Sequence, residues 1–107
     1  MVKTQNQFNL QIISLYGEIN ALSLPQLDMS IGSSHHRNFV IDLRDVLKLD
    51  SAGMAWIVKI FKAARKLGGQ AIPVWSQNDA ANRMIHLTQF DKIFTMADDV
   101  ETAIALL

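Results

Sequence analysis

A strand-like run that leads directly into an amphipathic helix lies at the centre of the chain and most constrains its fold. Residues 39–43 are apolar except for Asp42, as in a strand whose two faces are both covered. The residues behind this run repeat at helical spacing, and their shared apolar face holds Met54, Ile57, Val58, Phe61 and Ala64. Gly68 and Gly69 then provide a helix stop. A buried strand followed by such a helix predicts a mostly parallel sheet with helical crossovers.

The flanking segments continue this alternation. Within residues 2–16 we expect two antiparallel strands joined by a turn at 5–7. The downstream patterns predict, in chain order, a helix at 23–31 capped by Ser23, a polar loop at 32–38, a strand at 70–75, a helix at 76–87, a strand at 91–96 and a helix from 98 onward. Pro73 places the strand at 70–75 at a sheet edge or at a bulge. We therefore predict one α/β domain over residues 1–107, with the order β-β-α-β-α-β-α-β-α and a mixed, mostly parallel sheet.

Composition narrows the range of functions. Ten acidic residues balance ten basic ones, so the chain lacks the excess of positive charge that favours nucleic-acid binding. No cysteine is present, which excludes disulfides, thiolate nucleophiles and cysteine-based zinc sites. The first seven residues lack the apolar run of a signal peptide, and no apolar run approaches membrane-spanning length. We expect a cytoplasmic protein that neither binds nucleic acid nor inserts into a membrane.

The sequence also lacks motifs of catalysis. There is no G-x-S-x-G elbow, no Walker loop and no G-x-G-x-x-G. The adjacent His35 and His36 have no acidic or cysteine neighbour to complete a metal site, and His86 has no partner at helical spacing. We therefore predict a protein that is not an enzyme, with no catalytic residues, no metal ligands and no cofactor.

The join between strand and helix, Asp50-Ser51, is the position with the clearest regulatory potential. A hydroxyl at a helix start lies where backbone N–H groups lack partners and where the helix dipole favours negative charge. On spacing alone, Ser51 is a helix N-cap, and the alternative is a phosphoacceptor. Trp56, on the flank of the same helix, is either covered by a neighbouring element or exposed for a protein partner.

Five short segments recur in one known family, in the same order. They are 16–20 (Tyr-Gly-Glu-Ile-Asn), 40–43 (Val-Ile-Asp-Leu), 50–55 (Asp-Ser-Ala-Gly-Met-Ala), 67–69 (Leu-Gly-Gly) and 90–94 (Phe-Asp-Lys-Ile-Phe). On these segments the chain resembles, over nearly its whole length, the STAS domains of bacterial anti-sigma factor antagonists. It departs from the family pattern at four places, with Asn20 for a usual Asp, Ala52 for a common second hydroxyl, Met54-Ala55 for a frequent Leu-Gly and Gln89 for a usual Gly.

The resemblance implies a partner-switching regulator. In such systems the serine after the motif aspartate, here Ser51 after Asp50, is phosphorylated by a cognate serine kinase, often itself the sequestered anti-sigma-type partner. A PP2C-type phosphatase removes the phosphate, and the bare form binds the kinase or anti-sigma protein. We expect Ser51 to be the phosphoacceptor and the partner-binding residues to be Asn20, Asp50, Ser51, Ala52, Gly53, Met54, Trp56 and Lys59.

A second function from a different class stays open at this point. The chain could be a constitutive accessory subunit of a transporter or scaffold complex, with Ser51 only a helix N-cap. A third possibility, small-ligand binding or catalysis, has no motif behind it. The presence or absence of phosphate on Ser51 in cells discriminates between the first two.

Overall fold

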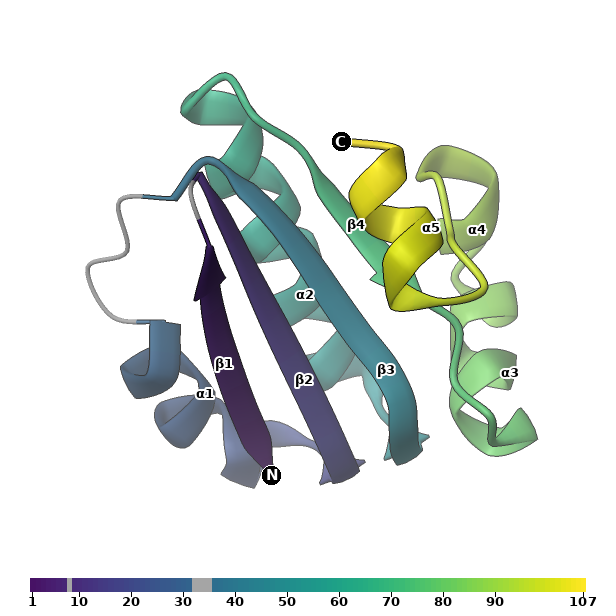
Figure 1. Ribbon diagram of the computed structural model, residues 1–107. Helices are drawn as coiled ribbons and strands as arrows, with labels where there is room; N and C mark the ends of the chain where they lie inside the picture. The colour runs from purple at the N-terminus through teal and green to yellow at the C-terminus, as the bar shows by residue number, and fades with distance from the viewer. Residues whose placement is uncertain (8, 32–35) are drawn as a thin grey trace.

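Residues 1–7, 9–31 and 36–107 are described by the computed structural model, in which one four-stranded sheet is packed between helices (Figure 1). The strands are β1 (Val2–Gln7), β2 (Leu10–Ile19), β3 (Asn38–Leu49) and β4 (Ala71–Val74). The helices are the 3₁₀ turn η1 (Ala21–Ser23), α1 (Leu24–Ile31), α2 (Ser51–Lys66), α3 (Asp79–Leu87), α4 (Phe90–Ile93) and α5 (Val100–Ala105). The predicted α/β class with a mixed sheet is confirmed.

The strand order places the connections that follow β2 and β3 side by side, where these two strands end. The order is β1-β2-β3-β4, with β1 antiparallel to β2 and the other two pairings parallel. Ile19 at the end of β2 pairs with Leu49 at the end of β3. Because parallel neighbours end at the same edge, the β2–η1 and β3–α2 connections lie next to each other there (Figure 1).

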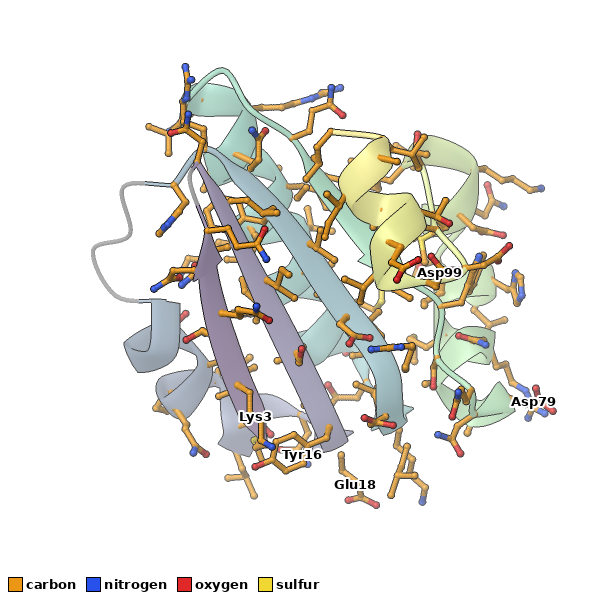
Figure 2. All side chains as sticks on the ribbon, in the orientation of Figure 1. Lys3, Tyr16, Glu18, Asp79 and Asp99 are labelled. Atoms are coloured by element: carbon orange, nitrogen blue, oxygen red, sulfur yellow. The ribbon has the colours of Figure 1, made fainter. Side chains whose placement is uncertain are left out.

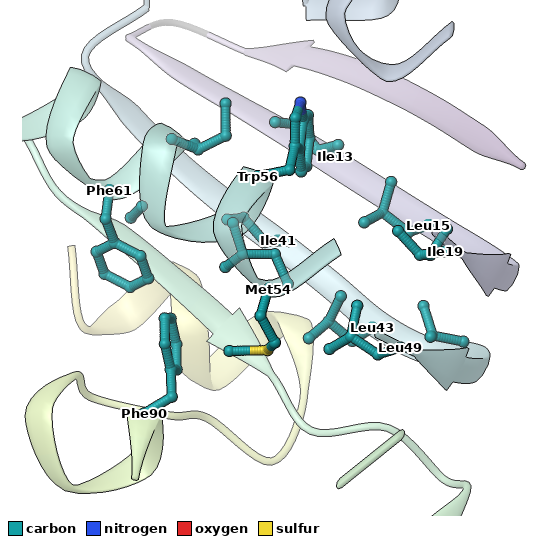
Figure 3. Close-up of a cluster of buried hydrophobic side chains, with 14 of the residues drawn as sticks. Ile13, Leu15, Ile19, Ile41, Leu43, Leu49, Met54, Trp56, Phe61 and Phe90 are labelled. Carbon is teal, nitrogen blue, oxygen red and sulfur yellow. The ribbon is translucent and has the colours of Figure 1, made fainter. Parts of the chain in front are cut away.

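Helix α2 packs on one face of the sheet, while α5 covers part of the other face. The inner side of α2 meets strand residues such as Ile41 in a large buried cluster, to which α1, α3 and α4 also contribute. Figure 3 shows Met54 and Phe61 of α2 within this cluster. The predicted helical stripe is confirmed for Met54, Ile57, Phe61 and Ala64, whereas Val58 is only partly buried. On the second face, Ala103 of α5 packs against Val40 and other strand residues.

The end of α2 is fixed by a close backbone approach. Gly68 has φ +80°, the left-handed conformation in which a helix commonly stops, and the Gly69 N–H donates to the Ala64 carbonyl at 2.9 Å. A Cβ on Gly69 would lie 1.9 Å from the carbonyl oxygen of Arg37, at the start of β3. Only glycine therefore lets the chain pass from α2 to β4 at this place.

The predicted strand at 91–96 is wrong. Helix α4 occupies Phe90–Ile93, and within the described residues only Ala97 makes a strand-like bridge, with Val74 of β4. The reason is aromatic packing: the Phe61 ring centroid lies 5.3 Å from that of Phe90 and 3.9 Å from that of Phe94. A single helical turn, but not an extended strand, brings residues four apart onto one ring.

Three smaller predictions are also corrected. Residues 5–7 continue β1 instead of forming a turn, since an exposed edge strand can be polar throughout. Asn20, and not Ser23, is the N-cap of η1, and the helix predicted from residue 76 begins at Asp79 because the Ser76 hydroxyl donates to the Val46 carbonyl at 2.7 Å. The predicted loop at 32–38 lies largely outside the described residues. Among the described helices, none has the length and apolarity needed to cross a membrane.

Candidate functional site

The β3–α2 junction is built around Asp50. This residue is the N-cap of α2: its Oδ1 accepts a hydrogen bond from the Gly53 N–H at 2.9 Å, and its carbonyl accepts from the Met54 N–H at 2.9 Å. Its own N–H donates to the carbonyl of Ile19 at 3.3 Å, which ties the start of the helix to the end of β2. The Asp50 side chain thus satisfies one of the backbone N–H groups that have no partner within the helix. Its backbone at the same time fixes the first turn of α2 to β2.

Ser51 is the first helical residue and is exposed. The N-cap interpretation of Ser51 is therefore wrong, since Asp50 performs that role. The Ser51 hydroxyl makes no hydrogen bond with any residue of the described ranges. It stands at the positive end of a helix of 16 residues, where added negative charge is tolerated.

Asn20 lies beside this junction, on the neighbouring connection. Its Oδ1 accepts from the Leu22 N–H at 2.9 Å, and its own N–H donates to the Ser23 hydroxyl at 3.3 Å, so the β2–η1 connection is rigid. Asn and Asp both accept such a bond, and the amide at position 20 fills the capping role without adding charge.

A cleft of about 360 Å³ opens at this edge of the sheet, with Asn20 and Asp50 in its wall. Two charged side chains border it: Glu18 of β2 and Lys48 of β3 pair across the strands, and their charged atoms are 3.9 Å apart. Figure 2 places Glu18 beyond the end of the sheet, pointing to solvent. Ala80 and Met84 of α3 close the other side. Sequence analysis did not assign Glu18, Lys48, Ala80 or Met84 to the candidate site. Glu18 and Lys48 could have been found from the expectation that neighbouring parallel strands end side by side.

Three of the residues expected to bind a partner are in the core. Gly53 is buried, and the side chains of Met54 and Trp56 are only 4% and 3% exposed. A Cβ on Gly53 would lie 3.0 Å from the Ile19 carbonyl oxygen, so this glycine lets α2 approach β2 closely. These three residues position α2, and they offer no side chain to a partner. The open question about Trp56 is thereby settled: it is covered.

Lys59 remains on the surface, two turns after Ser51. Its Nζ lies 3.6 Å from Oδ1 of Asp28 in α1, and both side chains are largely exposed. The same oxygen accepts the indole N–H of Trp56 at 2.9 Å. Of the residues expected to bind a partner, Asp50, Ser51 and Lys59 are therefore exposed, while Asn20 and Ala52 are half-buried.

His86 has a partner that helical spacing did not reveal. Its Nδ1 lies 3.0 Å from Oδ2 of Asp91, which belongs to the next helix, and its ring is 5.2 Å from that of Trp75. This pair connects α3 to α4, and neither residue lines the cleft beside the β3–α2 junction. Within residues 1–7, 9–31 and 36–107, no three histidine or acidic side chains gather as metal ligands would.

Two further charged groups mark the opposite face of the sheet. Asp42, only 5% exposed, accepts two side-chain bonds from Arg44, at 3.0 Å and 2.9 Å, and these bonds raise the pKa of the guanidinium. Asp99, the N-cap of α5, accepts the Thr102 N–H at 2.7 Å, which lowers the pKa of its carboxyl group. Both serve the fold, since they anchor β3 and the start of α5.

Comparisons with known proteins agree with this geometry. A family model described as the STAS domain matches residues 1–103. An anti-sigma factor antagonist from Mycobacterium paratuberculosis superimposes with a TM-score of 0.85 at 27% identity, over 99% of this chain and 92% of that one. A putative anti-sigma factor antagonist from Thermotoga maritima gives 0.85 at 22%, over 97% and 92%. The anti-sigma factor antagonist SpoIIAA in its unphosphorylated form gives 0.79 at 14%, over 97% and 93%. The last two likenesses concern the fold alone.

Proposed function

The chain belongs to the STAS domain family, as the resemblance of its motifs predicted, and on that premise we propose that it is a partner-switching regulator of the anti-sigma factor antagonist type. In this proposal the protein is not an enzyme. It binds a cognate serine kinase or anti-sigma-type protein when Ser51 is bare, and it releases that partner when Ser51 is phosphorylated. A PP2C-type phosphatase resets it, and the exchange takes place in the cytoplasm without a cofactor.

One observation carries the proposal: the Ser51 hydroxyl is exposed while the neighbouring Asp50 supplies the helix cap. A kinase can reach an exposed hydroxyl without unfolding α2. Because the cap does not depend on Ser51, phosphorylation leaves the hydrogen bonds of the first turn in place. The helix dipole also accommodates the added anion.

The charge of the modification explains how binding would be lost. A phosphate adds roughly −1.5 to −2 charges. On Ser51 it joins the carboxylate of Asp50 at the start of the helix. A partner fitted to the bare surface would meet repulsion and an added desolvation cost, while the fold would persist.

The proposed binding surface is narrower than the set expected from the sequence. It comprises Asn20, Asp50, Ser51, Ala52 and Lys59, which the structure leaves accessible at least in part. Gly53, Met54 and Trp56 support it from beneath. The name of the Mycobacterium paratuberculosis relative, an anti-sigma factor antagonist, supports an anti-sigma-type partner for a surface of this kind.

The test compares Ser51→Ala with Ser51→Asp. We expect both variants to fold, Ser51→Ala to retain a kinase or anti-sigma-type partner from lysate of the native cells, and Ser51→Asp to bind that partner far more weakly. Thr95→Asp is the matched control, because it adds the same charge at an exposed site near the other end of α2. Mass spectrometry of the protein from those cells should find phosphate on Ser51.

The contrary result is equally specific. If Ser51 stays bare under growth, starvation and stress, and both variants retain one membrane ATPase or scaffold complex equally well, the protein is a constitutive accessory subunit and the switch is disproved.

A further inference from the structure

The outer face of α2 carries an excess of positive charge. No Asp or Glu occurs between Asp50 and Asp79, an interval that holds four cations: Lys59, Lys62, Arg65 and Lys66. From Asp79 to the end of the chain the balance is reversed, with five acidic residues and two basic ones. Although the net charge of the chain is zero, α2 is therefore a basic helix.

Three of these cations form one line. Lys59, Lys62 and Lys66 are exposed and share a side of α2 with Ala55, Val58 and Ala63; we call these six residues the basic strip. The strip borders a shallow hollow of about 560 Å³. Lys59 is close to Asp28, but Lys62 and Lys66 form no ion pair with any described residue.

The shape of the strip selects the kind of partner. Its apolar members are small, and the largest, Val58, is half-buried, so no bulky side chain stands ready to insert into a lipid surface. Small residues flanked by lysine stems instead allow a second helix to approach closely. The lysines are spaced i, i+3 and i+7, which spans about 10 Å along the helix and matches carboxylates repeated on one side of a facing helix.

From this charge and shape we propose that the basic strip binds an acidic amphipathic helix of the partner protein. The inference rests on the proposed function, since it names the chemistry of the partner and extends the binding surface along α2. It also explains the direction of the switch. Ser51 stands at the N-terminal end of the same helix, about 12 Å from Lys59 along the helix axis. Its phosphate therefore faces one end of the acidic partner helix and repels it.

The direct test uses a defined probe. A synthetic alanine-rich helix with glutamates at i, i+3 and i+7 is titrated into isotopically labelled protein, and amide shifts are followed by NMR. We expect the shifts to map to residues 55–66, and the affinity to fall about tenfold in the double variant Lys62→Glu with Lys66→Glu. The matched control, Arg83→Glu with Lys92→Glu, makes the same change in net charge on exposed residues of α3 and α4 and should bind normally.

A second arm separates this inference from the proposed function. The partner retained by Ser51→Ala is tested against the Lys62, Lys66 double variant, with thermal melting to show that each variant is folded. Loss of binding with the strip variant, sparing the control, supports the inference. If Ser51→Asp loses the partner but the strip variant binds it fully, the inference fails and the switch stands. If the strip variant instead loses binding to phosphatidylserine vesicles while the acidic helix never binds, the strip is a membrane site and the inference is overturned.

Discussion

The indole N–H of Trp56 donates a 2.9 Å hydrogen bond to Oδ1 of Asp28, joining the middle of α2 to α1. Trp56 is only 3% exposed, so without this bond its indole N–H would be buried with no hydrogen-bond partner. The same carboxylate lies 3.6 Å from Nζ of Lys59. One acidic side chain thus serves the core on one side and the candidate binding surface on the other.

Removing that acceptor should destabilise the protein. We expect Asp28→Ala to lower the free energy of unfolding by about 1–3 kcal/mol, because the buried indole N–H is left unpaired. Asp28→Asn keeps an oxygen acceptor and should cost clearly less. Urea unfolding followed by tryptophan fluorescence measures both; equal losses for the two variants would show that the charge, and not the hydrogen bond, is what matters.

The capping residue Asp50 and the exposed Ser51 should respond differently to alanine. Asp50→Ala removes the side chain that holds the Gly53 N–H and should lower the free energy of unfolding by about 1 kcal/mol. Ser51→Ala should change it by less than about 0.5 kcal/mol, as is usual for exposed positions. Thermal unfolding of the two variants and of Asp50→Asn, which can still cap, checks this. A larger loss for Ser51→Ala would mean that serine contributes to the cap after all.

Two glycines should differ in their tolerance of a methyl group. Gly69→Ala forces a Cβ against the Arg37 carbonyl, a backbone group that cannot turn aside, and should cost about 3 kcal/mol. In Gly53→Ala the nearest atom is the tip of Leu49, 2.7 Å away, which can rotate, and the Ile19 carbonyl oxygen at 3.0 Å requires only a small shift, so we expect a loss of about 1 kcal/mol. Denaturant midpoints give the order, and the reverse order would contradict the packing described.

Acid should weaken the attachment of α5. The pKa of Asp99 lies below its ordinary value of 3.8 because the carboxylate accepts the Thr102 N–H. A carboxyl group whose pKa is lower in the folded chain stabilises the fold above its unfolded pKa, and this contribution is lost as the pH falls through the folded pKa. The melting temperatures of wild type and Asp99→Ala should therefore differ at neutral pH and converge well below pH 3.8. A difference that persists in strong acid would show that the stabilisation by Asp99 does not depend on its negative charge.

The sequence predicts those elements whose periodicity is long and complete. Helix α2 is of this kind. Strand β3 is predicted only from the run at 39–43, and it extends in the structure from Asn38 to Leu49. The segment at 91–96 is not of this kind, because its three apolar residues fit a strand or a helical turn equally well until Phe61 is placed beside Phe94.

The candidate site likewise could be predicted only in part. Its motif and its location follow from adjacent residues in the sequence, whereas its accessible surface depends on tertiary packing. Trp56 could not be placed from the sequence because its partner, Asp28, is 28 residues earlier in the chain. Met54 faces the core by the helical stripe, yet the family pattern drew it into the expected binding set. Membership of a sequence motif therefore does not show which side chains are exposed to solvent.

The separation of Asp50 as cap from Ser51 as the exposed hydroxyl has an evolutionary consequence. Mutations at position 51 escape the stability threshold that constrains most residues of a small domain. Under the proposed switch, a single codon change there would make a descendant permanently active, permanently silent or responsive to a different enzyme, while the scaffold is inherited intact. Gene duplicates of such a protein can thus diverge in regulation before they diverge in structure.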